Sequence, residues 1–176
     1  MDDVIQPFAL TCAAVIGFIL MVAAVAKVLN LSEIQQTIRQ LAHVSERSTV
    51  GIRCFSYAIV ASELLVGTSI LMGSAAGRFA GLLLMICFLA VACYAVAYKI
   101  RASCSCFGAS GAFTKWTIYR NLAFVVISAV SASSVARPFT MADVLHGAIA
   151  LVLSLCIRRL WENATAIRQL RLVGAI

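Results

Sequence analysis

Two cysteines separated by a single residue, in the stretch Cys104-Ser105-Cys106-Phe107-Gly108, are the residues of this sequence best suited to chemistry. Such a pair can form a disulfide, pass it to another pair of thiols, or supply two thiolates to a metal. A disulfide across one intervening residue closes a very small ring, so we expect it to be easily reduced. Lys99, Arg101 and Lys115 stand close in sequence and favour the reactive thiolate. The alternative is two reduced, unpaired cysteines in a loop.

A single acidic residue, Glu63, lies near the centre of a long apolar stretch, about 52–72. An ionisable group at that depth of a bilayer is costly unless it is paired, protonated or hydrated. Lys27 and Arg120 stand near the ends of other apolar stretches and are the candidate partners. We expect a structural ion pair inside a helix bundle. The alternative is a proton acceptor coupled to thiol or quinone redox chemistry.

The other five cysteines are Cys12, Cys54, Cys87, Cys93 and Cys156. Cys54 and Cys156 are predicted at the same membrane face as Cys104 and Cys106, and four thiolates would suit a tetrahedral zinc ion. These two cysteines come from separate helix ends and form no second close pair, so we expect no metal site. The remaining three are interpreted as small apolar residues of the helices.

The composition identifies the class of protein. Of 176 residues, 62% are hydrophobic and only 12% are charged, and the mean hydropathy is +1.00. Soluble domains carry about 25% charged residues, so we expect an integral membrane protein. The formal net charge of +7 then concerns membrane topology and anionic lipid. No motif interleaves aromatic and basic residues, and no nucleic-acid partner is expected.

The apolar stretches predict an all-α membrane protein with one domain, residues 1–176: a four-helix transmembrane bundle plus a fifth C-terminal transmembrane helix. Ser32-Glu33-Ile34-Gln35 has the pattern of a capping box and predicts a short helix. This helix either lies on the membrane surface or is a connector packed on the bundle. Gly77 and Gly81 form a GxxxG pair, which permits close approach of another helix. The predicted spans are about 8–29, 52–72, 78–98, 117–136 and 139–157.

The basic residues predict the orientation. With five spans and the N-terminus outside, twelve of the fourteen Lys and Arg residues fall on the cytoplasmic side. This is the asymmetry expected of positive-inside insertion. The predicted location is therefore the bacterial inner membrane, with the C-terminus and the Cys104–Cys106 loop in the cytoplasm.

Four features in this order resemble the MauE/DoxX family, and most closely its MauE members. They are Lys27 at the end of the first span, Glu63 in the second, the stretch Cys104–Gly108 after the third, and Arg120-Asn121 opening the fourth. The similarity covers about 15–128. Ser105 departs from the family, which often has glycine between the two cysteines.

This resemblance implies a role in methylamine utilisation, in the processing of the small (beta) subunit of methylamine dehydrogenase. That periplasmic subunit carries many disulfides and a tryptophan-derived quinone. MauE-like proteins are thought to work with a thioredoxin-like protein, MauD, so the implied partners are a MauD-like protein, the small subunit and the lipid bilayer. The implied activity is thiol–disulfide exchange at Cys104 and Cys106.

Two alternatives belong to other classes. One is an assembly or stability factor without redox turnover, and the other is a DoxX-like membrane subunit of a quinone-linked oxidoreductase, with quinone as a cofactor. The predicted topology also raises a difficulty, because a cytoplasmic pair cannot touch a periplasmic disulfide. Either electrons cross the bundle from a cytosolic thiol donor, or the loop folds into the membrane, or the orientation is reversed.

Overall fold

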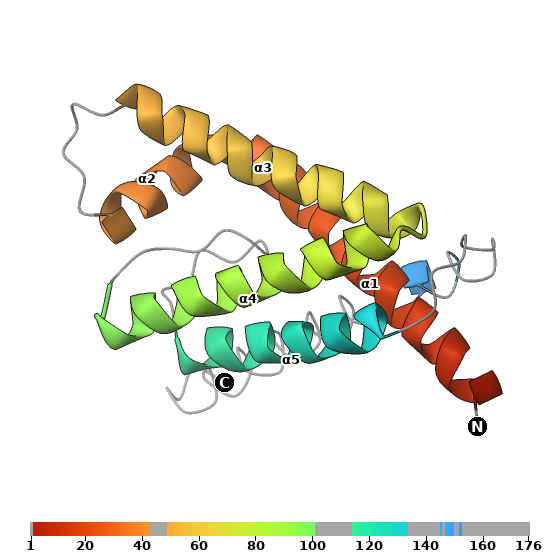
Figure 1. The fold of residues 1–176 in the computed structure, drawn as a ribbon. Helices are drawn as coiled ribbons and strands as arrows, with labels where there is room; N and C mark the ends of the chain where they lie inside the picture. Colours follow the sequence, from red (N-terminus) through yellow and green to blue (C-terminus); the bar gives the residue numbers. More distant parts are fainter. Residues whose placement is uncertain are drawn as a thin grey trace, which may run out of the picture.

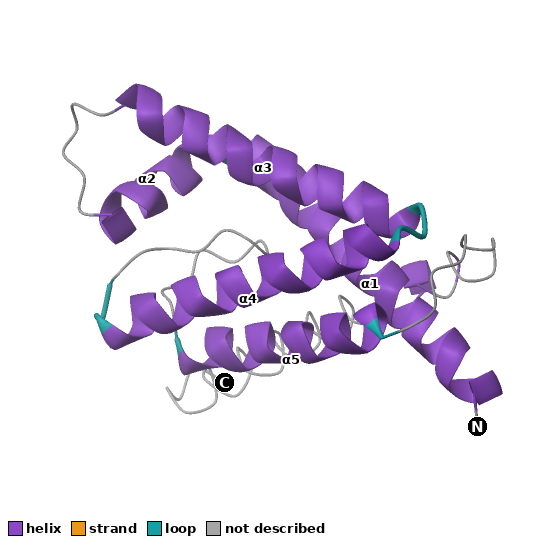
Figure 2. Cartoon of the chain, in the orientation of Figure 1, coloured by secondary structure: helices purple, strands orange, loops and turns teal. Residues whose placement is uncertain are grey.

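The computed structural model describes residues 2–42, 49–100 and 114–133, together with 145, 147–149 and 152. These residues form helices joined by short turns and contain no strand, which confirms the predicted all-α class (Figure 2). The loop that holds Cys104 and Cys106 lies outside the described residues. In chain order, the helices are α1 (Asp2–Leu29), α2 (Leu31–Ala42), α3 (Thr49–Leu71), α4 (Ala75–Ala97) and α5 (Lys115–Ala132) (Figure 1).

Four of these helices pack in a ring. α1 packs on α3, α3 on α4, α4 on α5, and α5 returns to α1 (Figure 1). Within the described residues, three helices are long and apolar enough to cross a membrane: Gln6–Leu29 of α1, α3 and α4. α5 is not among them, because its first two turns carry Lys115, Arg120 and Asn121. The four-plus-one arrangement of membrane spans therefore stays a prediction.

The helices begin earlier than the predicted spans. α1 starts at Asp2, α3 at Thr49 and α4 at Ala75, several residues before the apolar stretches that mark them in the sequence. A helix can continue into polar residues, whereas hydropathy detects only the part suited to lipid. The expected cap at Ser32 is wrong. α2 begins at Leu31, because the turn is closed at Asn30, whose carbonyl accepts hydrogen bonds from the backbone N–H groups of Glu33 and Ile34.

Glycines allow the closest contacts between helices. A Cβ atom on Gly77 would lie 2.8 Å from the backbone of Ser69, and one on Gly81 would lie 2.8 Å from Cδ1 of Ile70. This confirms the GxxxG prediction and identifies α3 as the helix that approaches. Gly17 of α1 and Gly67 of α3 face each other in the same way, with 3.1 Å from the Cβ position of Gly67 to the carbonyl oxygen of Gly17. The apolar core is built beside these contacts, from Ala13, Ile16, Leu20, Ile70 and Met85.

α1 flanks only one half of α3. Its last turn holds Lys27, which meets Glu63 in the middle of α3, and α1 ends two residues later. The chain then turns at Asn30, and α2 packs against α3 beside the half that α1 leaves uncovered (Figure 1). One side of α3 is therefore covered by α1 up to Glu63 and by α2 beyond it. The packing of α2 on α3 fits a connector packed on the bundle better than a helix that lies on the membrane surface.

The predicted fifth span, about 139–157, is described only in part. Its residues Leu145, Gly147–Ile149 and Val152 are helical. A Cβ atom on Gly147 would lie 2.4 Å from that of Ala14, so this segment packs directly on α1. The rest of the predicted span lies outside the described residues.

Candidate functional site

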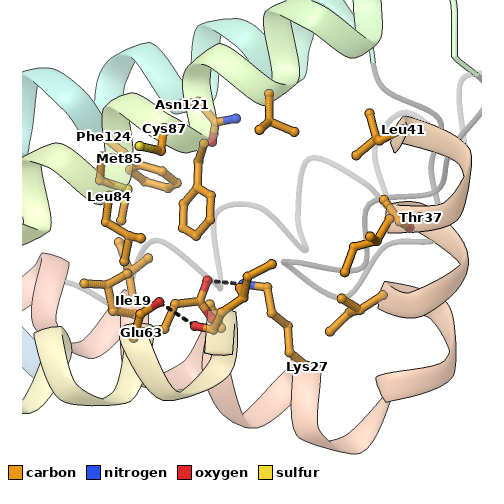
Figure 3. A pocket seen from close by; sticks show the side chains of 18 of the residues that line it. Ile19, Lys27, Thr37, Leu41, Glu63, Leu84, Met85, Cys87, Asn121 and Phe124 are labelled. Atoms are coloured by element: carbon orange, nitrogen blue, oxygen red, sulfur yellow. Dashed lines mark hydrogen bonds and ion pairs between the residues drawn. The ribbon is translucent and has the colours of Figure 1, made fainter. Parts of the chain in front are cut away.

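A buried ion pair joins α1 to α3. Nζ of Lys27 contacts Oε1 of Glu63 both as an ion pair and as a hydrogen-bond donor (Figure 3). The Lys27 side chain is 3% exposed and that of Glu63 is fully buried. Such burial is tolerated because each charge compensates the other, whereas either charge alone would be very costly. The pair thus fixes the register of α1 against α3 at the point where α1 ends.

An aromatic ring completes the surroundings of Lys27. The Nζ atom lies 5.1 Å from the ring centroid of Phe88 on α4, which is a cation–π geometry. Lys27 therefore links three helices: its own α1, α3 through the Glu63 carboxylate, and α4 through the Phe88 ring. A short or uncharged side chain at position 27 would lose both contacts.

The second oxygen of Glu63 is different. Oε2 is buried and has no hydrogen-bond partner among the described residues. An unsatisfied buried polar atom is unusual and costs about 1–3 kcal/mol. Glu63 is also one of the residues that line a cavity.

That cavity has a volume of about 290 Å³. Its walls are mostly apolar, with the Lys27–Glu63 pair on one side and Thr37 and Asn121 in other parts of the wall (Figure 3). α2 closes one side with Ile34, Thr37, Ile38 and Leu41, and α4 and α5 close the opposite side. A concave apolar pocket with a few convergent polar groups is the usual form of a small-molecule site.

Arg120 and Asn121 of α5 also line this cavity. Three of the predicted charges, Lys27, Glu63 and Arg120, are therefore gathered in one site from three helices. The contact with Glu63 is made by Lys27, and Arg120 stands in the cavity wall. Asn121 is 8% exposed and adds an amide that can both donate and accept hydrogen bonds.

The candidate redox residues are not tested by this geometry. Cys104, Cys106 and Cys156 lie outside the described residues. Within the described part, no three His, Cys, Asp or Glu side chains are placed to hold a metal ion. Cys12 is buried in α1, as expected of a small apolar residue, while Cys54, Cys87 and Cys93 are exposed on α3 and α4. Cys87 is also part of the cavity wall.

The cavity itself was not predicted from the sequence. Its aromatic residues, Phe55, Phe88 and Phe124, are ordinary members of apolar stretches, and no spacing marks them. The strongest available signal was the amphipathic pattern of the segment that became α2, whose apolar face covers the site. The arrangement is suited to bind a small molecule, because it places the Lys27–Glu63 pair beside apolar and aromatic walls.

Comparison with known proteins adds the family. Residues 5–134 match the family model described as "Methylamine utilisation protein MauE". No curated protein and no solved structure matches the chain. The matched region contains α1 except its first three residues, all of α2 to α5, the ion pair, Arg120 and the Cys104–Cys106 stretch. It is well over half of the 176 residues. The chain therefore belongs to the MauE family of methylamine utilisation proteins, and it is a membrane protein with an accessory role in that process.

Proposed function

We propose that this protein assists the maturation of the small (beta) subunit of methylamine dehydrogenase by thiol–disulfide exchange at Cys104 and Cys106. The observation that carries the proposal is the family match over residues 5–134, which spans the cysteine pair. The proposed setting is the bacterial inner membrane. The proposed partners are a MauD-like thioredoxin protein and the small subunit itself.

The chemistry requires only the two thiols. One cysteine attacks, as the thiolate, a sulfur of the partner's disulfide and forms a mixed disulfide, which the second cysteine resolves. The partner leaves as a dithiol, reduced by two electrons, and the Cys104–Cys106 pair becomes the disulfide. A thiol donor of the cytosol or a thioredoxin-like protein then reduces the pair by the same exchange. The neighbouring Lys99, Arg101 and Lys115 support the thiolate form.

Under this proposal, the Lys27–Glu63 pair has a structural role. It holds α1 and α3 in the register that leaves the cavity open. The described contacts favour this role over that of a proton acceptor, because the carboxylate is already engaged by the Lys27 ammonium.

The test is complementation of a strain that lacks this gene, grown on another carbon source in the presence of methylamine. Wild type should restore active dehydrogenase with a processed small subunit. The Cys104→Ser/Cys106→Ser variant should leave the small subunit unprocessed, with at least a tenfold loss of dehydrogenase activity, although it reaches the membrane in normal amount. Cys93→Ser is the matched control, because Cys93 lies on an exposed face of α4 outside the cavity.

Full activity with the double variant would reject thiol chemistry and favour the assembly-factor alternative. Unchanged dehydrogenase in the strain without the gene would reject the maturation role altogether.

A further inference from the structure

We propose that the cavity beside the ion pair holds one acyl chain of an anionic phospholipid, with the ester group of the lipid at Asn121. This inference goes beyond the maturation role, and it assigns a binding site for a membrane lipid. It does not depend on Cys104 and Cys106, so the two proposals can fail separately. Four observations point to this ligand: the position of the opening, the shape of the cavity, the side-chain amide of Asn121, and the charge at one end of the bundle.

The cavity reaches a surface that faces lipid. Phe55 of α3 and Cys87 and Val91 of α4 line it and are exposed at the surface of the molecule. Both helices are candidate membrane spans with most of their surface outside the core of the bundle. A hydrocarbon chain of the bilayer therefore has a lateral route between α3 and α4, which favours a lipid over a water-soluble compound.

The shape of the cavity suits a single hydrocarbon chain. Along α3 the lining extends from Phe55 to Glu63, which is about 12 Å of helix. One leaflet of the hydrocarbon core has a similar thickness, roughly 15 Å. The volume of about 290 Å³ is near the lower end of the range for small-molecule pockets, about 300–1,000 Å³. The cavity can therefore take one chain, whereas the second chain and the headgroup must stay outside.

Most polar groups of the wall already have partners. The hydroxyls of Thr37 and Ser62 donate hydrogen bonds of 2.9 Å and 2.7 Å to backbone carbonyl oxygens of their own helices. Lys27 and Glu63 compensate each other's charge. The deep part of the cavity, beside this pair, therefore offers no ready partner to a polar ligand group, which favours an alkyl chain there.

Asn121 is the exception. It is 8% exposed, and its side-chain amide makes no hydrogen bond among the described residues, although buried polar groups normally have a partner. Its amide atoms are not among the fully enclosed ones, unlike Oε2 of Glu63. Figure 3 shows Asn121 across the cavity from Thr37 and Leu41 of α2. The amide can therefore donate a hydrogen bond to an ester carbonyl oxygen of a lipid in the cavity.

The depth of Asn121 also suits an ester group. Tyr98 at the end of α4, and Trp116 and Tyr119 in the first turns of α5, are exposed at the same end of the bundle. Exposed tyrosine and tryptophan residues are typical of the membrane–water interface. Asn121 follows Trp116 by little more than one helical turn, so it lies at the inner edge of this interface, where the ester groups of phospholipids join the acyl chains.

The charges at this end favour an anionic headgroup. Arg53, Lys99 and Lys115 are exposed near the ends of α3, α4 and α5 that lie on this side of the bundle (Figure 1). Arg120 adds a basic residue to the cavity wall itself. Basic residues outnumber acidic ones on this side of the described bundle. Because basic residues at a membrane surface attract anionic lipid, we expect a negatively charged phospholipid rather than a zwitterionic one.

The experiment uses the full-length protein in detergent, and native mass spectrometry counts the lipids bound to each chain during a titration. The probes are dioleoylphosphatidylglycerol, which is anionic, and dioleoylphosphatidylcholine, which is zwitterionic. We expect one phosphatidylglycerol to bind saturably to each chain, about fivefold more tightly than phosphatidylcholine.

Two variants locate the site. Ser62→Leu, which places a larger side chain in the cavity wall and keeps both charges of the ion pair, should weaken this binding about tenfold. Asn121→Leu, which keeps the size of the side chain and removes its amide, should weaken it about fivefold. Leu65→Ala is the matched control and should bind as wild type does, since Leu65 is on the outer face of α3 and 68% exposed.

Thermal melting of each variant verifies that it is folded, and Asn121→Leu serves if Ser62→Leu unfolds. Cys104→Ser/Cys106→Ser should bind phosphatidylglycerol as wild type does, which separates this result from that of the maturation test. The proposal is overturned if neither lipid binds saturably, if the folded cavity variants bind as Leu65→Ala does, or if the two lipids bind equally well. Displacement of the lipid by glycerol phosphate at equal concentration would also overturn it, because the headgroup alone would then account for the binding.

Discussion

At the scale of single residues, the central feature is a lysine and a glutamate that neutralise each other inside the bundle. Lys27 and Glu63 are both buried, and each is the charge partner of the other. A buried pair contributes little net stability compared with an apolar pair of similar size, but the loss of one member leaves a bare charge in an apolar site. The main effect of this contact is therefore to fix the position of α1 relative to α3, and its contribution to net stability is small.

The first prediction follows from that asymmetry. Lys27→Met alone or Glu63→Leu alone should destabilise the protein by about 3–5 kcal/mol, because each leaves one uncompensated charge. The double variant Lys27→Met/Glu63→Leu should recover most of that loss. Thermal melting of the four proteins in one detergent gives the coupling between the two sites. If the losses of stability of the two single variants simply add in the double variant, the two charges do not compensate each other and the prediction is wrong.

The sequence is sufficient to predict that Glu63 is paired, but not which basic residue is its partner. Few charged side chains stand inside apolar stretches of the chain, so Glu63 has few candidate partners. Of the two candidate partners, Lys27 makes the contact with Glu63 and Arg120 lies in the cavity wall. The choice between them depends on where α1 ends, and no local pattern encodes that position.

At the scale of elements, helix contacts depend on glycines at the crossings. Gly77 and Gly81 could be identified from their spacing, but the partner helix could not, since GxxxG specifies a close approach without naming the neighbour. The Gly17–Gly67 contact between α1 and α3 gave no signal, because the two residues are far apart in the chain. The cavity was unpredictable for the same reason: it exists because α1 ends at the depth of Glu63 and α2 takes its place.

The second prediction concerns Gly77. A Cβ at this position would fall 2.8 Å from the backbone of Ser69, so α3 and α4 must separate to accept a side chain. Gly77→Val should therefore lower stability by about 1–3 kcal/mol, measured by thermal melting. The control is Gly51→Ala, because Gly51 is an exposed residue of α3. The control should be neutral or slightly stabilising, since alanine favours helix over glycine. Equal stability of Gly77→Val and wild type would argue against the close α3–α4 crossing.

At the scale of the whole molecule, the helices form a bundle in which the cavity beside the ion pair lies along one half of α3. α3 has 23 residues and a length of about 34 Å, which is close to the thickness of the hydrocarbon core. Glu63 lies near its middle, and the cavity extends from there toward the end of α3 at Thr49. In the predicted orientation, this is the cytoplasmic half, the side on which the basic residues are concentrated.

The third prediction tests that orientation. A maleimide that cannot cross the inner membrane is applied to cells whose outer membrane has been opened, with and without prior reduction. Cys104 and Cys106 should react only after permeabilisation and reduction. Met72→Cys, placed in the exposed turn between α3 and α4, should react without permeabilisation when introduced into the Cys104→Ser/Cys106→Ser protein. The reverse pattern would place the cysteine pair in the periplasm, where it could act directly on the client.

The most direct test of the proposed chemistry is to trap its intermediate. A Cys104→Ser or Cys106→Ser single variant removes one thiol, so the variant that keeps the attacking cysteine cannot resolve the mixed disulfide. Cells grown on another carbon source in the presence of methylamine are quenched with acid, alkylated and separated on a non-reducing gel, and the trapped partner is identified by mass spectrometry. We predict that one single variant accumulates a reducible adduct with a thioredoxin-like protein. The double variant should give none. The absence of an adduct from both single variants, with the small subunit matured as in wild type, would contradict thiol–disulfide exchange at this pair.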